Sequence, residues 1–194
     1  MYIRGFAVWF KQFAQHMPVY LITAHAYRSW SEGDPKGYVQ RGEGLMPPSS
    51  ALARYRARKA KHPKVRFEGE MQQVLNFVIE SIVPEKGAKL HACVTCPTHV
   101  HILVSFRTPE CGCNGAEYCA RGCEAREFAE DVLVRLKRKM GQALAKWAGT
   151  QEKPWFSRGW DLTPVRKRSH FDHLVNIYLP QHEENQAGVF KKYS

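Results

Sequence analysis

The spacing of apolar residues along the chain predicts alternating strands and helices. Residues 19–27 and 89–95 are rich in aliphatic and β-branched side chains, which is typical of strands. Residues 70–83 and 124–147 place apolar side chains every three or four positions, which indicates amphipathic helices. We expect Pro84 to stop the first of these helices. The stretch 37–50 is expected to be a loop, because it contains paired prolines and several glycines.

A further strand is predicted over residues 99–106, directly after a turn marked by Pro97. Its closeness to the strand at 89–95 suggests an antiparallel hairpin. Side chains alternate along a strand, so His99, His101 and Leu103 share one face and the intervening aliphatic residues share the other. Two imidazoles spaced in this way can bind one metal ion. Half-buried surface histidines are the alternative, because the three-residue pattern alone is not specific.

The C-terminal part predicts a strand at 161–168 and a last helix with Ser169 as its N-cap. Pro180 is incompatible with a regular helix interior. We therefore expect this helix to end or kink between Tyr178 and His182.

The net charge of +11 changes the picture, because it favours a polyanionic partner, nucleic acid before an anionic membrane. Residues 54–66 carry most of this charge and contain no acidic residue, which suits contact with a phosphate backbone. A solvated helix face is the alternative. Aromatic residues at 155–160 could stack on single-stranded bases or belong to the core. The candidate DNA-binding residues are Arg54, Arg56, Arg58, Lys59, Lys61, Lys64, Arg66, Arg158, Arg166, Lys167 and Arg168.

Four of the six cysteines, Cys111, Cys113, Cys119 and Cys123, lie in a glycine-containing stretch. Four thiols so close together fit a structural Zn²⁺ site, and free or redox-active thiols are the alternative. Apolar runs are too short to cross a bilayer, and residues 1–17 do not form a secretion signal. We therefore expect a cytoplasmic protein, associated with the nucleoid when bound to DNA, with no membrane partner.

These features resemble the single-tyrosine HUH transposases of the insertion-sequence type and their REP-associated tyrosine transposase relatives. The resemblance covers about residues 17–190. It rests on the stretch His99-Val100-His101, on Tyr178 followed four residues later by a polar residue, and on the tryptophan-containing stretch at 155–160. It divides the chain into an N-terminal extension at 1–16 and one domain at 17–194, with a Cys-rich insertion at 111–123.

The resemblance implies an α+β fold of the HUH-endonuclease type. Its core would be a ferredoxin-like antiparallel sheet with helices on one face and the histidine strand in its middle. It also implies that Tyr178 is the nucleophile, and that His99, His101 and the residue at 182 hold a divalent metal, Mg²⁺ or Mn²⁺. The family has Gln or Asn at that last position, whereas this chain has His182, and Gln181 or Glu183 could substitute for it.

The function implied is that of a single-stranded DNA transposase and endonuclease. It would cut hairpin ends of DNA and join strands through a 5′-phosphotyrosine intermediate. Three alternatives stay open at this point: a domesticated protein that binds hairpin DNA or RNA without cutting, a replication or relaxase-type nicking enzyme, and a cytosolic zinc hydrolase. The sequence also leaves open a homodimer, with the active site built within one chain or between two.

Overall fold

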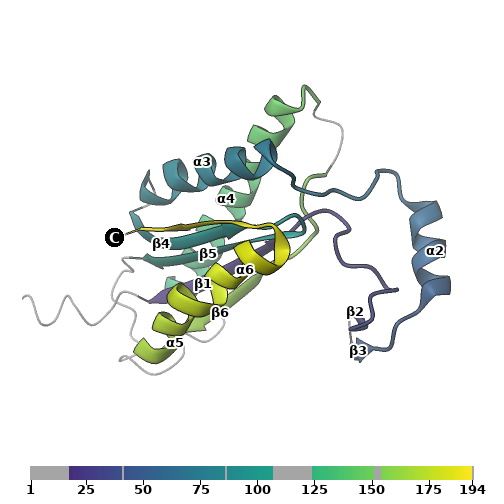
Figure 1. The fold of residues 1–194 in the computed structure, drawn as a ribbon, viewed down its shortest axis with the longest axis horizontal. Coiled ribbons are helices and arrows are strands. Elements are labelled where there is room, and N and C mark those ends of the chain that lie inside the picture. The colour runs from purple at the N-terminus through teal and green to yellow at the C-terminus, as the bar shows by residue number, and fades with distance from the viewer. Residues whose placement is uncertain (1–17, 41, 86, 107–123, 151–153, 194) are drawn as a thin grey trace, which may run out of the picture.

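The computed structural model describes residues 18–40, 42–85, 87–106, 124–150 and 154–193. A five-stranded sheet forms its centre, with strand order β6-β1-β5-β4-β7 and antiparallel pairing throughout (Figure 1). The strands are β1 (Val19–His25), β4 (Ala88–Thr95), β5 (His99–Phe106), β6 (Asp161–Val165) and β7 (Val189–Lys192). The long helices are α3 (Glu70–Glu85) and α4 (Glu124–Trp147). The order β1-α3-β4-β5-α4-β6 is the ferredoxin-like arrangement, so the predicted α+β class and the central place of β5 are confirmed.

One face of the sheet carries the larger core, and α3 and α4 cover it (Figure 1). The aliphatic positions of β5 point into this core, as the alternation of side chains predicts. They meet Leu75 and Ile79 of α3 and Leu133 and Leu136 of α4, which are all fully buried. Burial of these apolar side chains supplies the main driving force for folding and fixes β5 as a rigid central strand.

The opposite face carries a smaller core beneath a second helical layer. This layer consists of α5 (Arg168–His173), a π-helical turn η1 (Leu174–Tyr178) and α6 (Leu179–Gln186). Leu174, Val175 and Leu179 pack there against Leu103 of β5 and neighbouring strands. Helices therefore cover both faces, where the resemblance implied one. The reason is that the other face of the sheet is also apolar and needs a cover of its own.

A separate arm stands beside the sheet and consists of a two-stranded ribbon and a helix (Figure 1). The ribbon pairs β2 (Tyr38–Gln40) with β3 (Gly44–Met46), in the region that was predicted to be a loop. The helix is α2 (Ser50–Lys59), where the Ser49 hydroxyl accepts a hydrogen bond from the Leu52 amide at 3.3 Å. None of the ten residues of α2 is buried, so this helix is available to contact another molecule.

Several predicted boundaries were wrong by a few residues. Helix α3 ends at Glu85, one residue beyond Pro84, where it was expected to stop. The first strand ends at His25 and the strand from Asp161 ends at Val165. Ser169 is not the N-cap of α5: the helix begins at Arg168, and Lys167 occupies the cap position without a side-chain hydrogen bond. Strand β7 was not predicted.

The helix break expected near Pro180 takes the form of a π-helical turn. The Leu179 amide donates to the Leu174 carbonyl five residues earlier, and α6 follows directly with Pro180 in its first turn. In a regular α-helix the proline ring would clash with the carbonyl of residue 176. The wider turn just before the proline relieves this conflict. The helical segment therefore continues from Tyr178 to His182 without an end between them.

The predicted Cys-rich insertion at 111–123 and the extension at 1–16 lie outside the described residues. Among the described helices, none combines the length and apolarity needed to pass through a lipid bilayer.

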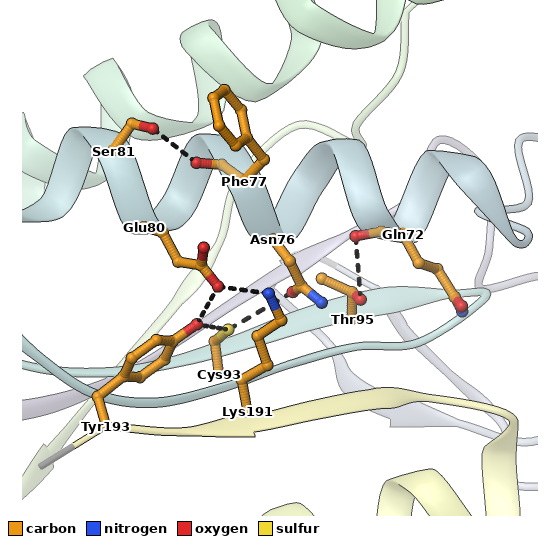
Figure 2. Close-up of polar contacts among 9 residues, drawn as sticks. All are labelled: Gln72, Asn76, Phe77, Glu80, Ser81, Cys93, Thr95, Lys191 and Tyr193. Atoms are coloured by element: carbon orange, nitrogen blue, oxygen red, sulfur yellow. Dashed lines mark hydrogen bonds and ion pairs between the residues drawn. The ribbon is translucent and has the colours of Figure 1, made fainter.

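Strand β7 is tied to α3 by a polar cluster that Figure 2 shows in detail. The Glu80 carboxylate accepts hydrogen bonds from Lys191 Nζ at 2.6 Å and from the Tyr193 hydroxyl at 2.7 Å. These two bonds lower the pKa of Glu80 below its usual value. The buried Cys93 thiol lies 3.6 Å from the same tyrosine oxygen and 3.5 Å from Asn76 Oδ1. The cluster thus fixes the end of the chain that follows α6.

Replacing Glu80 with glutamine should destabilise the protein by about 1 kcal/mol at pH 7, because a charged acceptor of two hydrogen bonds becomes a neutral one. The exposed Glu85 lies on the same helix, so Glu85→Gln is the matched control and should leave stability nearly unchanged. Urea denaturation of both variants beside the wild type measures the difference.

The same experiment has a defined pH dependence. The pKa of Glu80 is lower in the folded chain, so its stabilisation is complete above the unfolded value of about 4.3. It is lost as the pH falls through the folded value. The difference between wild type and Glu80→Gln should therefore shrink in acid. An equal difference at pH 7 and pH 3 would contradict this assignment.

Candidate metal and tyrosine site

Three histidines from two distant parts of the chain converge on one side of the sheet. His99 and His101 come from β5, and His182 comes from α6, which lies over the same face. One ligand atom of each imidazole lies within 4.8 Å of those of the other two. The ring centroid of His101 lies 4.6 Å from that of His99 and 4.8 Å from that of His182. The spacing allows the three rings to bind a single ion.

Each of the three imidazoles has its Nδ1 atom engaged by an oxygen. His101 Nδ1 lies 2.8 Å from the Thr23 hydroxyl, and His99 Nδ1 lies 2.9 Å from the Thr98 hydroxyl. His182 Nδ1 donates to the Tyr178 carbonyl at 2.8 Å. The Tyr178 carbonyl can only accept, so it holds the His182 proton on Nδ1 and leaves Nε2 as the ligand atom. The threonine hydroxyls can accept from Nδ1 of His101 and His99 in the same way, which would leave their Nε2 atoms as ligands. The donor set therefore fits a divalent metal.

Burial keeps the two histidines of β5 neutral, which is the form that binds a metal. It lowers the pKa of His101 to about 2, and the neighbouring His99 and His182 lower it further. It also lowers the pKa of His99 to about 4, with His182 and His25 contributing. Protons therefore compete little with a metal for these rings near neutral pH.

Tyr178 lies at the edge of the histidine cluster within the same chain. Its hydroxyl is 3.4 Å from His101 Nε2, and its ring centroid is 4.8 Å from that of His182. The spacing of four residues places Tyr178 and His182 on one face of the helix, which the π-helical turn keeps continuous. Burial raises the pKa of the Tyr178 hydroxyl, and the nearby Cys96 adds to this effect. The phenol is thus protonated in the structure at neutral pH.

A backbone clip holds the end of α6 that carries His182. The Gly188 amide donates to the His182 carbonyl at 3.0 Å. Ala187 adopts a left-handed conformation with φ of 50°, and its carbonyl accepts from Gln72 Nε2 of α3 at 3.0 Å. A Cβ atom at Gly188 would lie 2.8 Å from the His182 carbonyl oxygen and 2.9 Å from Val94 Cγ2. The site therefore requires glycine at 188.

The candidate DNA-binding cations are all exposed, and they lie in two groups. The first group lies on α2 and the segment after it. The sequence suggested that its charges are uncompensated, but Arg56 pairs with Glu32 at 2.5 Å and Arg66 pairs with Glu68 at 2.8 Å. These acidic partners lie outside the basic stretch, which is why its composition did not reveal them. The second group surrounds β6, where Arg168 pairs with Asp172 at 2.9 Å.

The aromatic stretch at 155–160 divides between core and surface. Trp155 is buried in the larger core, whereas Arg158 and Trp160 are exposed. Lys137 of α4 donates to the carbonyls of Ser157 and Gly159 and lies 5.7 Å from the Trp160 ring centroid.

Cys93 and Cys96 are buried free thiols in the two separate cores, and burial raises their pKa values to about 11 and about 12.

Sequence reasoning missed the residues that orient the histidines. Thr23 lies opposite His101 in the register of β1 and β5, so it becomes visible only once that register is known. Gln72 reaches a loop 115 positions away in the chain. His25 lies opposite His99 and is the one missed residue with a sequence signal, since it lies within the strand predicted at 19–27.

Comparison with known proteins finds similarity among solved structures. No protein-family model matches the sequence, and the search of curated proteins found no match. The fold is similar to a solved structure described as a REP-associated tyrosine transposase bound to a REP hairpin. The similarity covers 87% of this chain and 68% of that chain, with 12% sequence identity and a TM-score of 0.44.

Replacing Thr23 with valine should weaken metal binding by roughly ten- to a hundredfold, because His101 loses the partner of its Nδ1 proton. Valine has nearly the same shape as threonine, so the sheet should stay intact. Thr163→Val on the neighbouring β6 replaces an exposed threonine and serves as the matched control. Isothermal titration with Mn²⁺ measures both affinities. Equal affinity in Thr23→Val and wild type would refute the orienting role.

Gly188→Ala should weaken binding of the same ion and destabilise the fold, because the added methyl group displaces the His182 carbonyl. Gly141→Ala is the matched control: this glycine lies in α4 with no atom within 4 Å of an added Cβ. Alanine there should be neutral or stabilising by up to about 1 kcal/mol. Mn²⁺ titration and thermal melting separate the two effects. An unchanged Mn²⁺ affinity in Gly188→Ala would count against the role of the clip in holding His182.

Proposed function

We propose that the protein is a metal-dependent enzyme that cuts and rejoins single-stranded DNA through a covalent bond to Tyr178. The observation that carries this proposal is the convergence of three metal-binding histidines with the Tyr178 hydroxyl, 3.4 Å from His101 Nε2. A tyrosine beside a metal site and an exposed basic helix supports attack on a phosphodiester better than hydrolysis by water.

The reaction assigned to the chain is a transesterification. The Tyr178 oxygen attacks the scissile phosphorus, a bond forms between them, and the bond from phosphorus to the 3′ oxygen breaks. The phenol proton is lost and the leaving 3′ oxygen gains one, so the balance needs no other reactant. The products are a 5′-phosphotyrosine and a free 3′ hydroxyl. Attack by a second 3′ hydroxyl reverses the step and joins strands without ATP.

His99, His101 and His182 would hold the metal. A divalent ion bound there would polarise the scissile phosphate and stabilise the negative charge that develops on its oxygens. Nitrogen ligands favour a transition-metal ion such as Mn²⁺ over Mg²⁺, whose ligands are mostly oxygen. His182 replaces the amide side chain that the HUH families place at this position. Its hydrogen bond to the Tyr178 carbonyl ties the third ligand to the nucleophile.

The partner we propose is single-stranded DNA that carries a hairpin. The exposed cations of α2 and of the segment around β6 would contact its phosphates, with the strong dependence on salt that such contacts produce. Arg54, Arg58, Lys59, Lys61 and Lys64 are the cations of the first group for which the structure gives no acidic partner among the described residues.

The test is incubation of the protein with a pool of hairpin-bearing single-stranded oligonucleotides and Mn²⁺ or Mg²⁺, followed by a denaturing gel. Oligonucleotides with a 3′ label should give a labelled band at the combined mass of the protein and the attached fragment, whereas a 5′ label should be released on a shorter fragment. Tyr178→Phe should abolish the covalent band, because it removes the attacking oxygen and keeps the ring. Tyr27→Phe, a partly buried tyrosine elsewhere, is the control.

His182→Ala should reduce the rate of covalent bond formation by at least tenfold while DNA binding at low salt persists. Binding of the oligonucleotides without any covalent band, across both metals, would replace the proposed enzyme with a protein that binds hairpins without cutting. A covalent band that survives in Tyr178→Phe would show that another residue is the nucleophile.

A further inference from the structure

The aromatic ring of Trp30 is exposed and is linked to His99 through the ring of His25. Half of this residue's surface is open to solvent. Its ring centroid lies 6.1 Å from that of His25, whose centroid lies 5.9 Å from that of His99. Trp30, His25 and His99 therefore form a row of rings from the arm to the metal ligands. A molecule stacked on Trp30 would therefore be separated from His99 by the rings of Trp30 and His25.

The indole is held in one orientation although it is exposed. Its Nε1 atom donates to the Gly37 carbonyl at 2.8 Å, which satisfies its polar group. His25 Nε2 lies 3.8 Å from Asp161 Oδ2, beyond hydrogen-bond distance. A fixed aromatic surface loses little conformational entropy on binding, which favours stacking over loose hydrophobic contact.

The turn that carries Trp30 is tied to the basic helix. The Ser49 amide donates to the Glu32 carbonyl at 2.6 Å, and the Glu32 carboxylate pairs with Arg56 of α2. Gly33 packs closely enough that an added Cβ would lie 3.5 Å from Ala53 Cβ. Phosphates bound along α2 would thereby lie in a fixed relation to Trp30. The positive charge of this arm is complementary to a polyanion. The exposed ring of Trp30 is complementary to a flat aromatic group.

Other exposed tryptophans lack this setting. Trp147 lies on α4, and its Nε1 atom donates to the Glu70 carboxylate at 3.2 Å, which would repel a phosphate. Trp160 has Lys137 beside its ring. Neither of them has a ring contact with His25 or His99 in the described part of the chain. Trp30 is distinguished by its exposure, by the hydrogen bond that holds its ring and by its ring contact with His25.

We propose that the face of Trp30 stacks on an unpaired nucleobase next to the scissile phosphate. This assigns a base-binding subsite to the arm and rests on the proposed function, since it presumes that single-stranded DNA enters the histidine site. Stacking on an aromatic face is tolerant of sequence and strengthens binding of single strands. Trp30 acts here as a positioning residue that sets which phosphate reaches Tyr178.

The test compares two substitutions that a structural role would not separate. Trp30→Ala removes the ring, and Trp30→Phe keeps an aromatic face but loses the hydrogen bond to Gly37. Stacking predicts that Trp30→Ala weakens binding of a labelled single-stranded oligonucleotide by roughly tenfold and that Trp30→Phe stays within a few fold of wild type. A role limited to holding the turn predicts equal losses in both variants. Trp147→Ala is the matched control and should bind as wild type does.

A scan with abasic sites places the stacked base. Each oligonucleotide of the scan lacks one base. Affinity for the wild type should fall only when the missing base is the one beside the cut. The same abasic oligonucleotide should bind Trp30→Ala and Trp30→Phe with unequal losses, none in the alanine variant and a clear one in the phenylalanine variant. Equal sensitivity to abasic sites in wild type and Trp30→Ala would overturn the inference.

The outcomes separate this inference from the proposed function. A Tyr178-dependent covalent band with unchanged binding and unchanged cut position in Trp30→Ala would overturn the stacking subsite alone. Trp30-dependent binding at one base, without a covalent band in the wild type, would support the subsite and refute the cutting activity. Absence of both would refute both.

Discussion

The packing of Leu174, Val175 and Leu179 on the sheet is the contact on which the candidate site depends. It places a helix over the face of β5 that carries the histidines. Without this contact Tyr178 and His182 would have no fixed relation to His99 and His101, since they are far apart in the chain. The site is thus assembled by hydrophobic burial, and the polar contacts described above refine an arrangement that apolar packing sets up.

Much of the fold follows from the sequence by simple physical rules. The alternation along residues 99–106 predicts which side chains enter the larger core, and the structure confirms it. The stripe of residues 124–147 predicts α4 with the bounds observed. Helix and strand ends were predicted less well. Ser169 has the chemistry of an N-cap, but the helix begins at Arg168, so Ser169 lies inside its first turn.

Some residues of the candidate site could be predicted from the sequence and others could not. The strand pattern predicts His99 and His101 as a pair, and the resemblance adds Tyr178 and His182, which the structure brings to one place. The groups that orient them could not be found from the sequence. Thr23 depends on the register of two strands, and the Gln72 bond to Ala187 depends on how α3 meets the end of α6. Such contacts are properties of the tertiary structure and leave no local signal.

The unequal size of the two cores has a mechanical consequence. His99 and His101 belong to a strand anchored by the large core, while His182 and Tyr178 lie on a layer held by the small one. Segments held by less buried area open more readily than the rest of a protein. The layer that carries Tyr178 and His182 is therefore expected to open more readily than the sheet. An ion shared by the three histidines would oppose that opening, because its ligands would come from both layers.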